Sequence, residues 1–203
     1  MEWLTKEEIA ERSCMSNFEA AKVTVEHHRQ VLAATREELQ VAISRGYVSL
    51  TSGFCGLCER YHGKGLPCPL RGSICSGWEC ADPWYEAHKA LMGALLPDAT
   101  PADWDTWRAA EAELIAKLQV IQDRELAEDI YTRLTASGVD TEDLNGIDTF
   151  VDELDFDQLI IWADYAEVSH DEEMWGKHEW TEKENELRSA VYQALVSAVN
   201  GVS

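Results

Sequence analysis

The sequence has no run of apolar residues that approaches the roughly 18–20 needed to span a bilayer. Its first residues, MEWLTKEEIAERS, also lack the basic segment and the apolar segment that together mark a secretory signal peptide. We therefore expect the protein to stay in the cytoplasm in which it is made. In a reducing cytosol, clustered cysteines are metal ligands more often than they are disulfides.

Basic residues are scarce, because the chain holds 17 Lys and Arg against 38 Asp and Glu, a net charge of −21. The imbalance is concentrated in residues 101–203, which hold 25 acidic and 7 basic residues, a net charge of −18. Such a surface repels nucleic-acid phosphates and anionic membranes, and it attracts basic protein surfaces. The alternative interpretation is a solvated face that only confers solubility.

Alternating patterns typical of strands are nearly absent, and the sequence predicts an all-α fold of long helices. Helix-start signals predict helices from about Lys6, from Ser16 to about Gly46, from Asp82, and from Thr100 to about Ala136. Shorter helices are expected over 147–153, 156–167 and 181–200. The helix after Ser16 carries a seam at heptad spacing, which favours a helical hairpin or bundle and could equally serve a homodimer. The seam residues are Phe18, Ala21, Val25, His28, Leu32, Thr35, Leu39 and Ala42.

The composition divides the chain into four segments. Residues 1–50 are N-terminal helices, and residues 51–97 are a Cys-rich zinc knuckle followed by a short helix. Residues 98–138 form the second long helix, and residues 139–203 form an acidic helical lobe. The knuckle is thus predicted to lie between the two long helices and to fix the turn between them.

Five of the six cysteines lie between Cys55 and Cys80, with the spacing C-x2-C-x9-C-x6-C-x4-C. Two closely spaced thiolates and two more returned by a loop are what a closed, four-coordinate structural zinc site needs. We predict Cys55, Cys58, Cys68 and Cys75 as the ligands, with Cys80 or His62 as alternates. The alternative is a group of buried thiols, or pairs that oxidise. A structural zinc would stabilise the fold without acting on a substrate.

The cysteine segment resembles that of small uncharacterised accessory proteins of tailed bacteriophages. The resemblance rests on Cys55-Gly56-Leu57-Cys58, Tyr61, Cys68-Pro69-Leu70, Cys75 and Pro83-Trp84-Tyr85, and it covers about 40 residues. That pattern often has a further cysteine just before the C-P-L motif, where this chain has Gly65-Leu66-Pro67, so the fourth ligand stays open. The resemblance implies a phage accessory protein and brings no activity with it.

Three functions remain open at this stage. The first is a non-enzymatic, phage-encoded inhibitor or modulator that binds a basic, nucleic-acid-binding surface of a host protein in the host cytoplasm. The second is a metal-dependent enzyme that uses the carboxylates and histidines of 164–179, although the chain has no H-E-x-x-H, G-x-S-x-G or phosphate-binding loop motif. The third is a nucleic-acid-binding knuckle that uses Arg60, Lys64 and Arg71. Predicted partner-binding residues for the first are Asp152, Glu153, Asp155, Asp157, Asp171, Glu172, Glu173 and Trp175.

Overall fold

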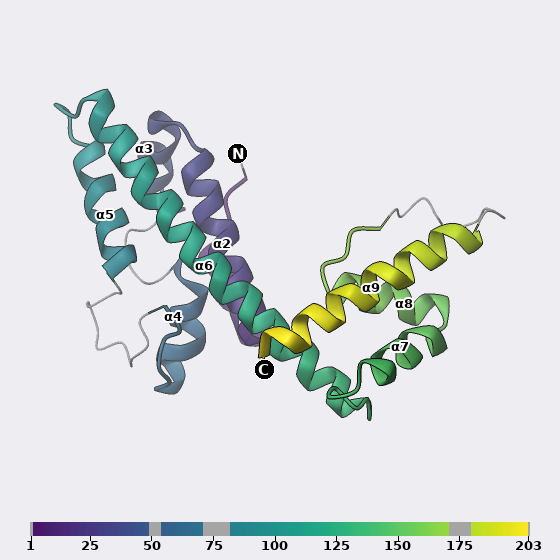
Figure 1. Cartoon of the computed structure of the whole chain (residues 1–203). Helices are drawn as coiled ribbons and strands as arrows, with labels where there is room; N and C mark the ends of the chain where they lie inside the picture. Colours follow the sequence, from purple (N-terminus) through teal and green to yellow (C-terminus); the bar gives the residue numbers. More distant parts are fainter. Residues whose placement is uncertain (1, 49–53, 71–81, 171–179, 203) are drawn as a thin grey trace. The chain divides into compact units, whose positions relative to one another are not determined.

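A computed structural model of the chain describes residues 2–48, 54–70, 82–170 and 180–202 (Figure 1). In these ranges the regular structure is helical and no sheet is present, which confirms the predicted all-α fold. None of the helices in these ranges is long and apolar enough to cross a membrane. The elements are α1 (Lys6–Met15), α2 (Asn17–Ala33), α3 (Arg36–Ser44), α4 (Gly56–Tyr61), the 3-10 turn η2 (His62–Lys64), α5 (Asp82–Ala94), α6 (Pro101–Ala136), α7 (Leu144–Glu153), α8 (Phe156–Tyr165) and α9 (Trp180–Val202).

The chain forms two compact units, which are described separately below. Unit 1 comprises Met1–Asp123 and unit 2 comprises Arg124–Ser203. The boundary falls inside α6, so this helix contributes residues to both units. Unit 2 holds 20 acidic and 5 basic residues, a net charge of −15, whereas unit 1 holds 18 acidic and 12 basic residues, a net of −6.

Local signals in the sequence fix several helix ends. The predicted capping box at the start of α1 is present, with the Thr5 hydroxyl accepting the Glu8 N–H and the Glu8 carboxylate accepting the Thr5 N–H. At the C-terminal end of α6, Gly138 has a φ of 80°, and the Val139 N–H donates to the Leu134 carbonyl, as in a Schellman motif. Both ends lie where the sequence predicted them.

The prediction of one continuous helix from Ser16 to about Gly46 was wrong. A second capping box interrupts it, because the Thr35 hydroxyl accepts the Glu38 N–H while the Glu38 carboxylate accepts the Thr35 N–H. Ala34 has an extended backbone between α2 and α3. The capping box satisfies the first backbone N–H groups of α3, so α2 ends before Thr35 and α3 begins after it.

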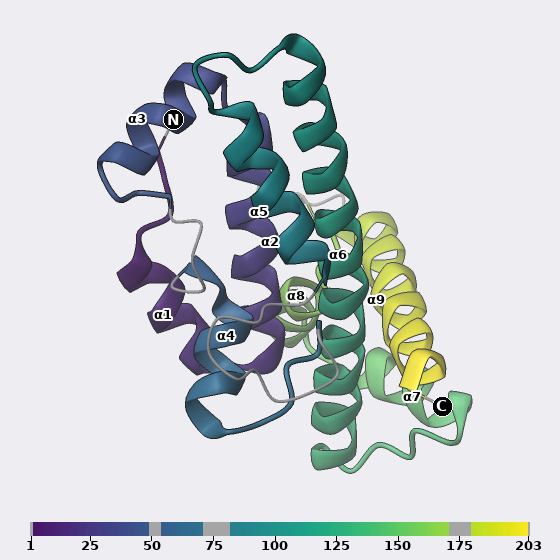
Figure 2. The same ribbon diagram turned by 90° about the vertical axis from the view of Figure 1, so that its left-hand side faces the viewer.

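In unit 1, α2 runs beside α5 and the first part of α6 (Figures 1 and 2). The buried face of α2 is wider than the predicted seam, because Ala20, Val23 and Thr24 are as buried as the seam residues Ala21 and Val25. Such broad burial is typical of a central helix covered on several sides. The core around its middle joins α2, α4, α5 and α6 through Ala21, Val25, Leu57, Tyr61, Trp84, Ala87, Leu114 and Leu118.

In unit 2, the C-terminal part of α6 packs with α7, α8 and α9 around one apolar core. Its most buried members are Leu134, Ile147, Leu159, Ala163, Val191 and Leu195. Arg188 of α9 adds polar contacts, since its guanidinium donates to the carbonyls of Val151 (2.5 Å) and Leu154 (2.8 Å) and to the Glu184 carboxylate (2.7 Å). Arg188 thereby adds charge-assisted hydrogen bonds to carbonyls at the C-terminal end of α7.

We expect Arg188→Met to destabilise unit 2 by about 2 kcal/mol, because charge-assisted hydrogen bonds to part-buried carbonyls would be lost. Lys183→Met, an exposed position on the same helix, is the matched control and should change the free energy of unfolding by less than about 0.5 kcal/mol. The measurement is urea unfolding of the full chain monitored by helical circular dichroism. Equal effects of the two substitutions would contradict the capping role of Arg188.

Candidate functional site

The C-x-x-C motif forms the start of α4. Cys55 is the N-cap of this helix, and its sulfur accepts the Cys58 N–H at 3.4 Å. The helix is anchored to α2 by the Thr24 hydroxyl, which accepts the Leu57 N–H at 3.3 Å. A turn capped by a cysteine brings the two sulfurs to the same end of the helix, which is the geometry that a knuckle requires.

Gly56 is the residue that lets α4 approach α1 and α2 so closely. A Cβ at this position would lie 2.6 Å from the Ala20 carbonyl oxygen and 2.7 Å from both Ser13 Oγ and Val23 Cγ1. Such distances are far below ordinary contact between atoms in a packed core. The glycine between the two cysteines is therefore needed for packing, independently of any metal.

Cys68 and Cys55 belong to the same buried apolar cluster, and the partly buried Cys58 packs against it. The hydrogen bond with Cys58 and complete burial raise the pKa of Cys55 well above its usual range, and a charge on Cys68 adds to this rise. The same hydrogen bond lowers the pKa of Cys58. Cys58 is thus the thiol of the pair that ionises first.

Three of the four predicted zinc ligands thus belong to one apolar cluster, and thiolates are ligands that suit zinc. The described ranges alone do not complete a site, since they contain no group of three or more His, Cys, Asp or Glu side chains placed to hold a metal ion. The predicted fourth ligand Cys75 and its alternate Cys80 lie outside the described residues. The other alternate, His62, is exposed in η2. Zinc binding stays a prediction that depends on Cys75 or Cys80.

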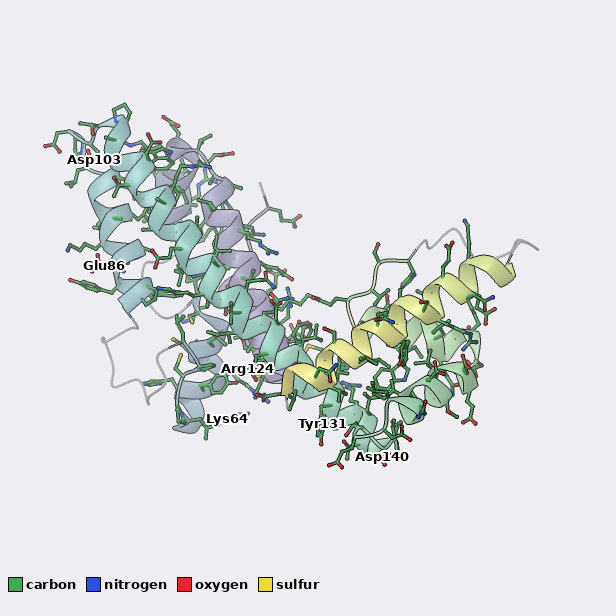
Figure 3. The ribbon with its side chains drawn as sticks, in the orientation of Figure 1. Lys64, Glu86, Asp103, Arg124, Tyr131 and Asp140 are labelled. Carbon is green, nitrogen blue, oxygen red and sulfur yellow. The ribbon has the colours of Figure 1, made fainter. Side chains whose placement is uncertain are left out.

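The cations predicted to contact nucleic acid have different surroundings. Arg60 donates to the Asn17 side chain and to the Cys14 carbonyl, both at 2.9 Å, so it joins α4 to α1 and α2. Lys64 is exposed in η2, as Figure 3 shows. Arg71 lies outside the described residues. One of the three cations is thus engaged in packing within unit 1.

Four predicted partner-binding acids, Asp152, Glu153, Asp155 and Asp157, lie together where α7 ends and α8 begins. We call these four residues the acidic corner, and all are exposed. Asp155 also has a structural role, because its carboxylate caps α8 by accepting the Gln158 N–H at 2.8 Å. The other predicted partner-binding residues, Asp171, Glu172, Glu173 and Trp175, lie outside the described residues.

The arginines of unit 2 make their contacts away from the acidic corner's carboxylates. Arg124 pairs with Glu125 at 2.7 Å, and Arg133 stacks on the ring of Tyr165. Arg188 reaches the corner only through backbone carbonyls, while its ion pair is with Glu184. The ion pairs of Arg124 and Arg188 with Glu125 and Glu184 thus involve carboxylates outside the acidic corner, while the Arg188 guanidinium lies 3.5 Å from the Asp152 carbonyl oxygen.

The predicted enzymatic cluster of 164–179 is described only at its start. His170 Nε2 lies 2.7 Å from Asp164 Oδ1, so the structure joins one predicted histidine to one predicted carboxylate. Glu167 follows α8 with a φ of 55°, a left-handed backbone conformation uncommon for a residue other than glycine. The remaining members of the cluster lie outside the described residues, and a catalytic metal at this place stays a prediction.

A buried histidine pocket in unit 1 was missed by the sequence analysis. His28 Nδ1 of α2 lies 2.6 Å from Glu111 Oε1 of α6, and both side chains are almost fully buried. The adjacent His27 stacks on Phe54, and Trp84 of α5 meets the His28 ring edge-on at a centroid distance of 4.6 Å. The heptad seam correctly placed His28 on a buried face. No sequence motif near His28 indicates that it pairs with Glu111, 83 positions later.

The two histidines line a cavity of about 30 Å³ between α2, α5 and α6. Its other polar lining residues are His88 and Glu111, and its apolar walls include Val31, Val48, Ala87, Leu91 and Leu114. Burial lowers the pKa of His27 to about 3, and electrostatic repulsion between its charged form and His28 is a further cause of this lowering. His27 is therefore neutral at physiological pH.

Comparison of the chain with protein-family models, with curated proteins and with solved structures finds no match. A function must therefore be argued from the charge and the chemistry of the chain itself.

Proposed function

We propose that the protein is a non-enzymatic, zinc-stabilised acidic interaction protein. It would be phage-encoded and would bind a basic, nucleic-acid-binding surface of a host protein, such as a defence or replication enzyme, as an inhibitor or modulator. The observation that carries this proposal is the net charge of −15 on unit 2, together with the exposed carboxylates of the acidic corner.

The acidic corner supplies the recognition in this proposal. Asp152, Glu153 and Asp157 present carboxylates to solvent on adjacent helix ends, where they would take the place of phosphates on the partner. Unbalanced charge of this kind accelerates association with a surface of opposite sign and makes binding sensitive to salt. Asp171, Glu172 and Glu173 would extend the charged face, and Trp175 would supply an aromatic anchor.

Charge reversal tests the acidic corner. The triple variant Asp152→Lys, Glu153→Lys and Asp157→Lys should lower the association rate with a captured basic partner at least tenfold at low salt. A matched control reverses three exposed acids of unit 1, Glu86, Asp98 and Asp105, and so changes the net charge equally.

The association rates of both triple variants would be measured by surface plasmon resonance over a range of salt concentrations. We expect the association rate to fall only in the variant of the acidic corner. If both variants lose the same amount, attraction is set by net charge alone, and the acidic corner is not a binding site.

The zinc would stabilise the part of unit 1 that contains α4. We expect about one zinc per chain, because four thiolates bind one tetrahedral ion. Removing the zinc with a chelator should lower the melting temperature of unit 1, since the free energy of binding a structural zinc is coupled to folding. Metal content would be measured by atomic emission on the purified chain.

Single cysteine variants complete this test. Cys58→Ser should lose the zinc, whereas Cys14→Ser, which alters an exposed thiol on α1, should retain it. A wild-type chain that purifies without zinc, and that takes up none when zinc is added, would contradict this part of the proposal.

A further inference from the structure

An open groove lies along α3, at the outer edge of unit 1 (Figure 2), and the proposed function does not use it. Its volume of about 370 Å³ falls within the range of pockets that bind ligands. The groove is lined by Trp3, Glu37, Glu38, Val41, Arg45 and Tyr47, among others. Val41 and Tyr47 are 48% and 43% exposed, so large apolar side chains of the groove contact solvent.

The groove follows the axis of α3. Glu37, Val41 and the C-cap residue Arg45 are spaced four positions apart, so they form one row on the face of the helix. At a rise of 1.5 Å per residue, the row from Glu37 to Arg45 spans about 12 Å. It has an acid at one end, an apolar side chain in the middle and a base at the other end.

The wall formed by Trp3 is held in place within unit 1. Its side chain packs against the apolar core that α3 shares with α2, α5 and α6. The amide of Gln30 in α2 fixes the backbone on either side of it, because it accepts the Leu4 N–H at 3.0 Å and donates to the Glu2 carbonyl at 3.3 Å. The groove is therefore formed before any ligand binds, which lowers the entropy lost on binding.

The two ends of the groove carry opposite charges. Glu37 and Arg45 are both exposed. Glu38 adds negative charge beside Glu37, because the hydrogen bonds of its capping box lower the pKa of its carboxyl. The guanidinium of the preceding Arg36 is engaged with α5, where it donates to the Leu96 carbonyl at 2.5 Å. A ligand that complements this groove is thus positive at one end and negative at the other.

We propose that the groove binds an extended peptide segment of a partner protein in which a basic, an apolar and an acidic residue occupy positions i, i+2 and i+4. Alternate residues of an extended chain lie on one face, and four positions at about 3.3 Å each span about 13 Å. This length matches the row on α3. The basic residue lies at Glu37, the apolar residue at Val41 and the acidic residue at Arg45. The inference is independent of the acidic corner and of zinc.

A segment with charge of one sign is a poorer match to the groove. A uniformly basic segment would bring positive charge against Arg45, and a uniformly acidic one would bring negative charge against Glu37 and Glu38. The partner of this groove therefore differs in chemistry from the basic surface proposed for the acidic corner.

Three synthetic peptides of one composition test the spacing and the direction of the bound segment. The first is acetyl-Gly-Lys-Ser-Leu-Ser-Glu-Gly-amide, and the second is its reverse, acetyl-Gly-Glu-Ser-Leu-Ser-Lys-Gly-amide. The third, acetyl-Gly-Ser-Lys-Leu-Glu-Ser-Gly-amide, places the leucine on the face opposite to the two charges. Each is titrated into the ¹⁵N-labelled full chain, and backbone amide and tryptophan indole resonances are followed by nuclear magnetic resonance.

One of the first two peptides should give saturable shifts of the amides of residues 37–45 and of the Trp3 indole N–H. Its affinity should exceed that of the third peptide by about threefold or more, since exposed ion pairs contribute little each. The peptide that binds more tightly defines the direction of the segment. Equal affinities of all three peptides, or no saturable shift at these residues, would overturn the proposal.

Charge reversal at Arg45 tests the acidic position of the segment. Arg45→Glu should weaken the tighter peptide about fivefold, and replacing the glutamate of that peptide by lysine should restore binding to this variant. Arg108→Glu, at an exposed arginine of α6 in the same unit, changes the net charge equally and should affect neither peptide. Equal losses in both variants would contradict a contact at Arg45. If Arg45→Glu does not fold, the three peptides on the wild-type chain decide the proposal.

Discussion

Replacing Gly56 by alanine should destabilise unit 1 by about 2–3 kcal/mol, the upper range for overpacking a core. The added Cβ would meet the Ala20 carbonyl oxygen at 2.6 Å, and this oxygen belongs to the backbone of the central helix α2. Backbone in a packed helix cannot move aside as the end of a flexible side chain can. Urea unfolding of the full chain, followed by circular dichroism, measures the change in the free energy of unfolding.

Gly93→Ala is the matched control for this experiment. Gly93 lies in α5, and a Cβ there would meet no heavy atom within 4 Å. Because alanine has the higher helix propensity, this change should be neutral or stabilising by up to about 1 kcal/mol. A neutral result for Gly56→Ala would show that α4 does not pack against α2 as described. It would also weaken the case that α4 holds the cysteines in a fixed position.

Unit 1 should lose about 2 kcal/mol of stability between pH 7 and pH 5, and about 4 kcal/mol by pH 3, through His27 alone. The folded-state pKa of His27 is about 3, against an ordinary value of 6.5, because burial disfavours its charged form. Between these values the unfolded chain binds more protons than the folded chain. Stability is therefore complete above about pH 6.5 and falls as the pH falls toward 3.

The His27→Gln variant isolates this contribution. Carboxylates elsewhere in the chain titrate in both proteins, so the measured quantity is the difference in unfolding free energy between wild type and variant as a function of pH. His62→Gln serves as the control, since an exposed histidine should leave the pH dependence unchanged. If His27→Gln retains the full wild-type dependence between pH 7 and pH 4, His27 is not buried in its neutral form.

The elements that the sequence predicted well are those fixed by neighbours along the chain. The capping box of Thr5 and Glu8 and the glycine end of α6 at Gly138 involve residues within five positions of one another. The start of α6 at Pro101 is equally local. Such signals act before tertiary packing, so they can be identified in a single sequence.

The prediction of one continuous helix over residues 16–46 failed at another local signal, a capping box. The capping box of Thr35 and Glu38 was present in the sequence, but the heptad pattern across it favoured one continuous helix. Periodicity reports which face is buried, and it continues across a break when both helices bury residues in the same unit. Local capping chemistry was the stronger determinant at this position.

The candidate sites also divide into those set by neighbours along the chain and those set by tertiary packing. The C-x-x-C turn of Cys55 and Cys58 is a local motif, and Cys68 belongs to the same apolar cluster, while their joint binding of zinc stays a prediction. The pair of His28 and Glu111 depends on how α2 and α6 are packed, and the two residues are 83 positions apart in the sequence. A single sequence gives no information on such a pairing, whereas the 2.6 Å distance between His28 Nδ1 and Glu111 Oε1 shows it directly.

The contacts of Arg188 have a consequence for the order in which unit 2 folds. The carbonyls that it binds belong to residues 34–37 positions earlier in the chain. Leu187, Val191 and Leu195, which surround it on α9, also fill the core of the unit. During synthesis, α7 and α8 therefore leave the ribosome before the helix that closes their core exists. Because long-range contacts of this kind form late, folding of unit 2 should be completed only after α9 emerges.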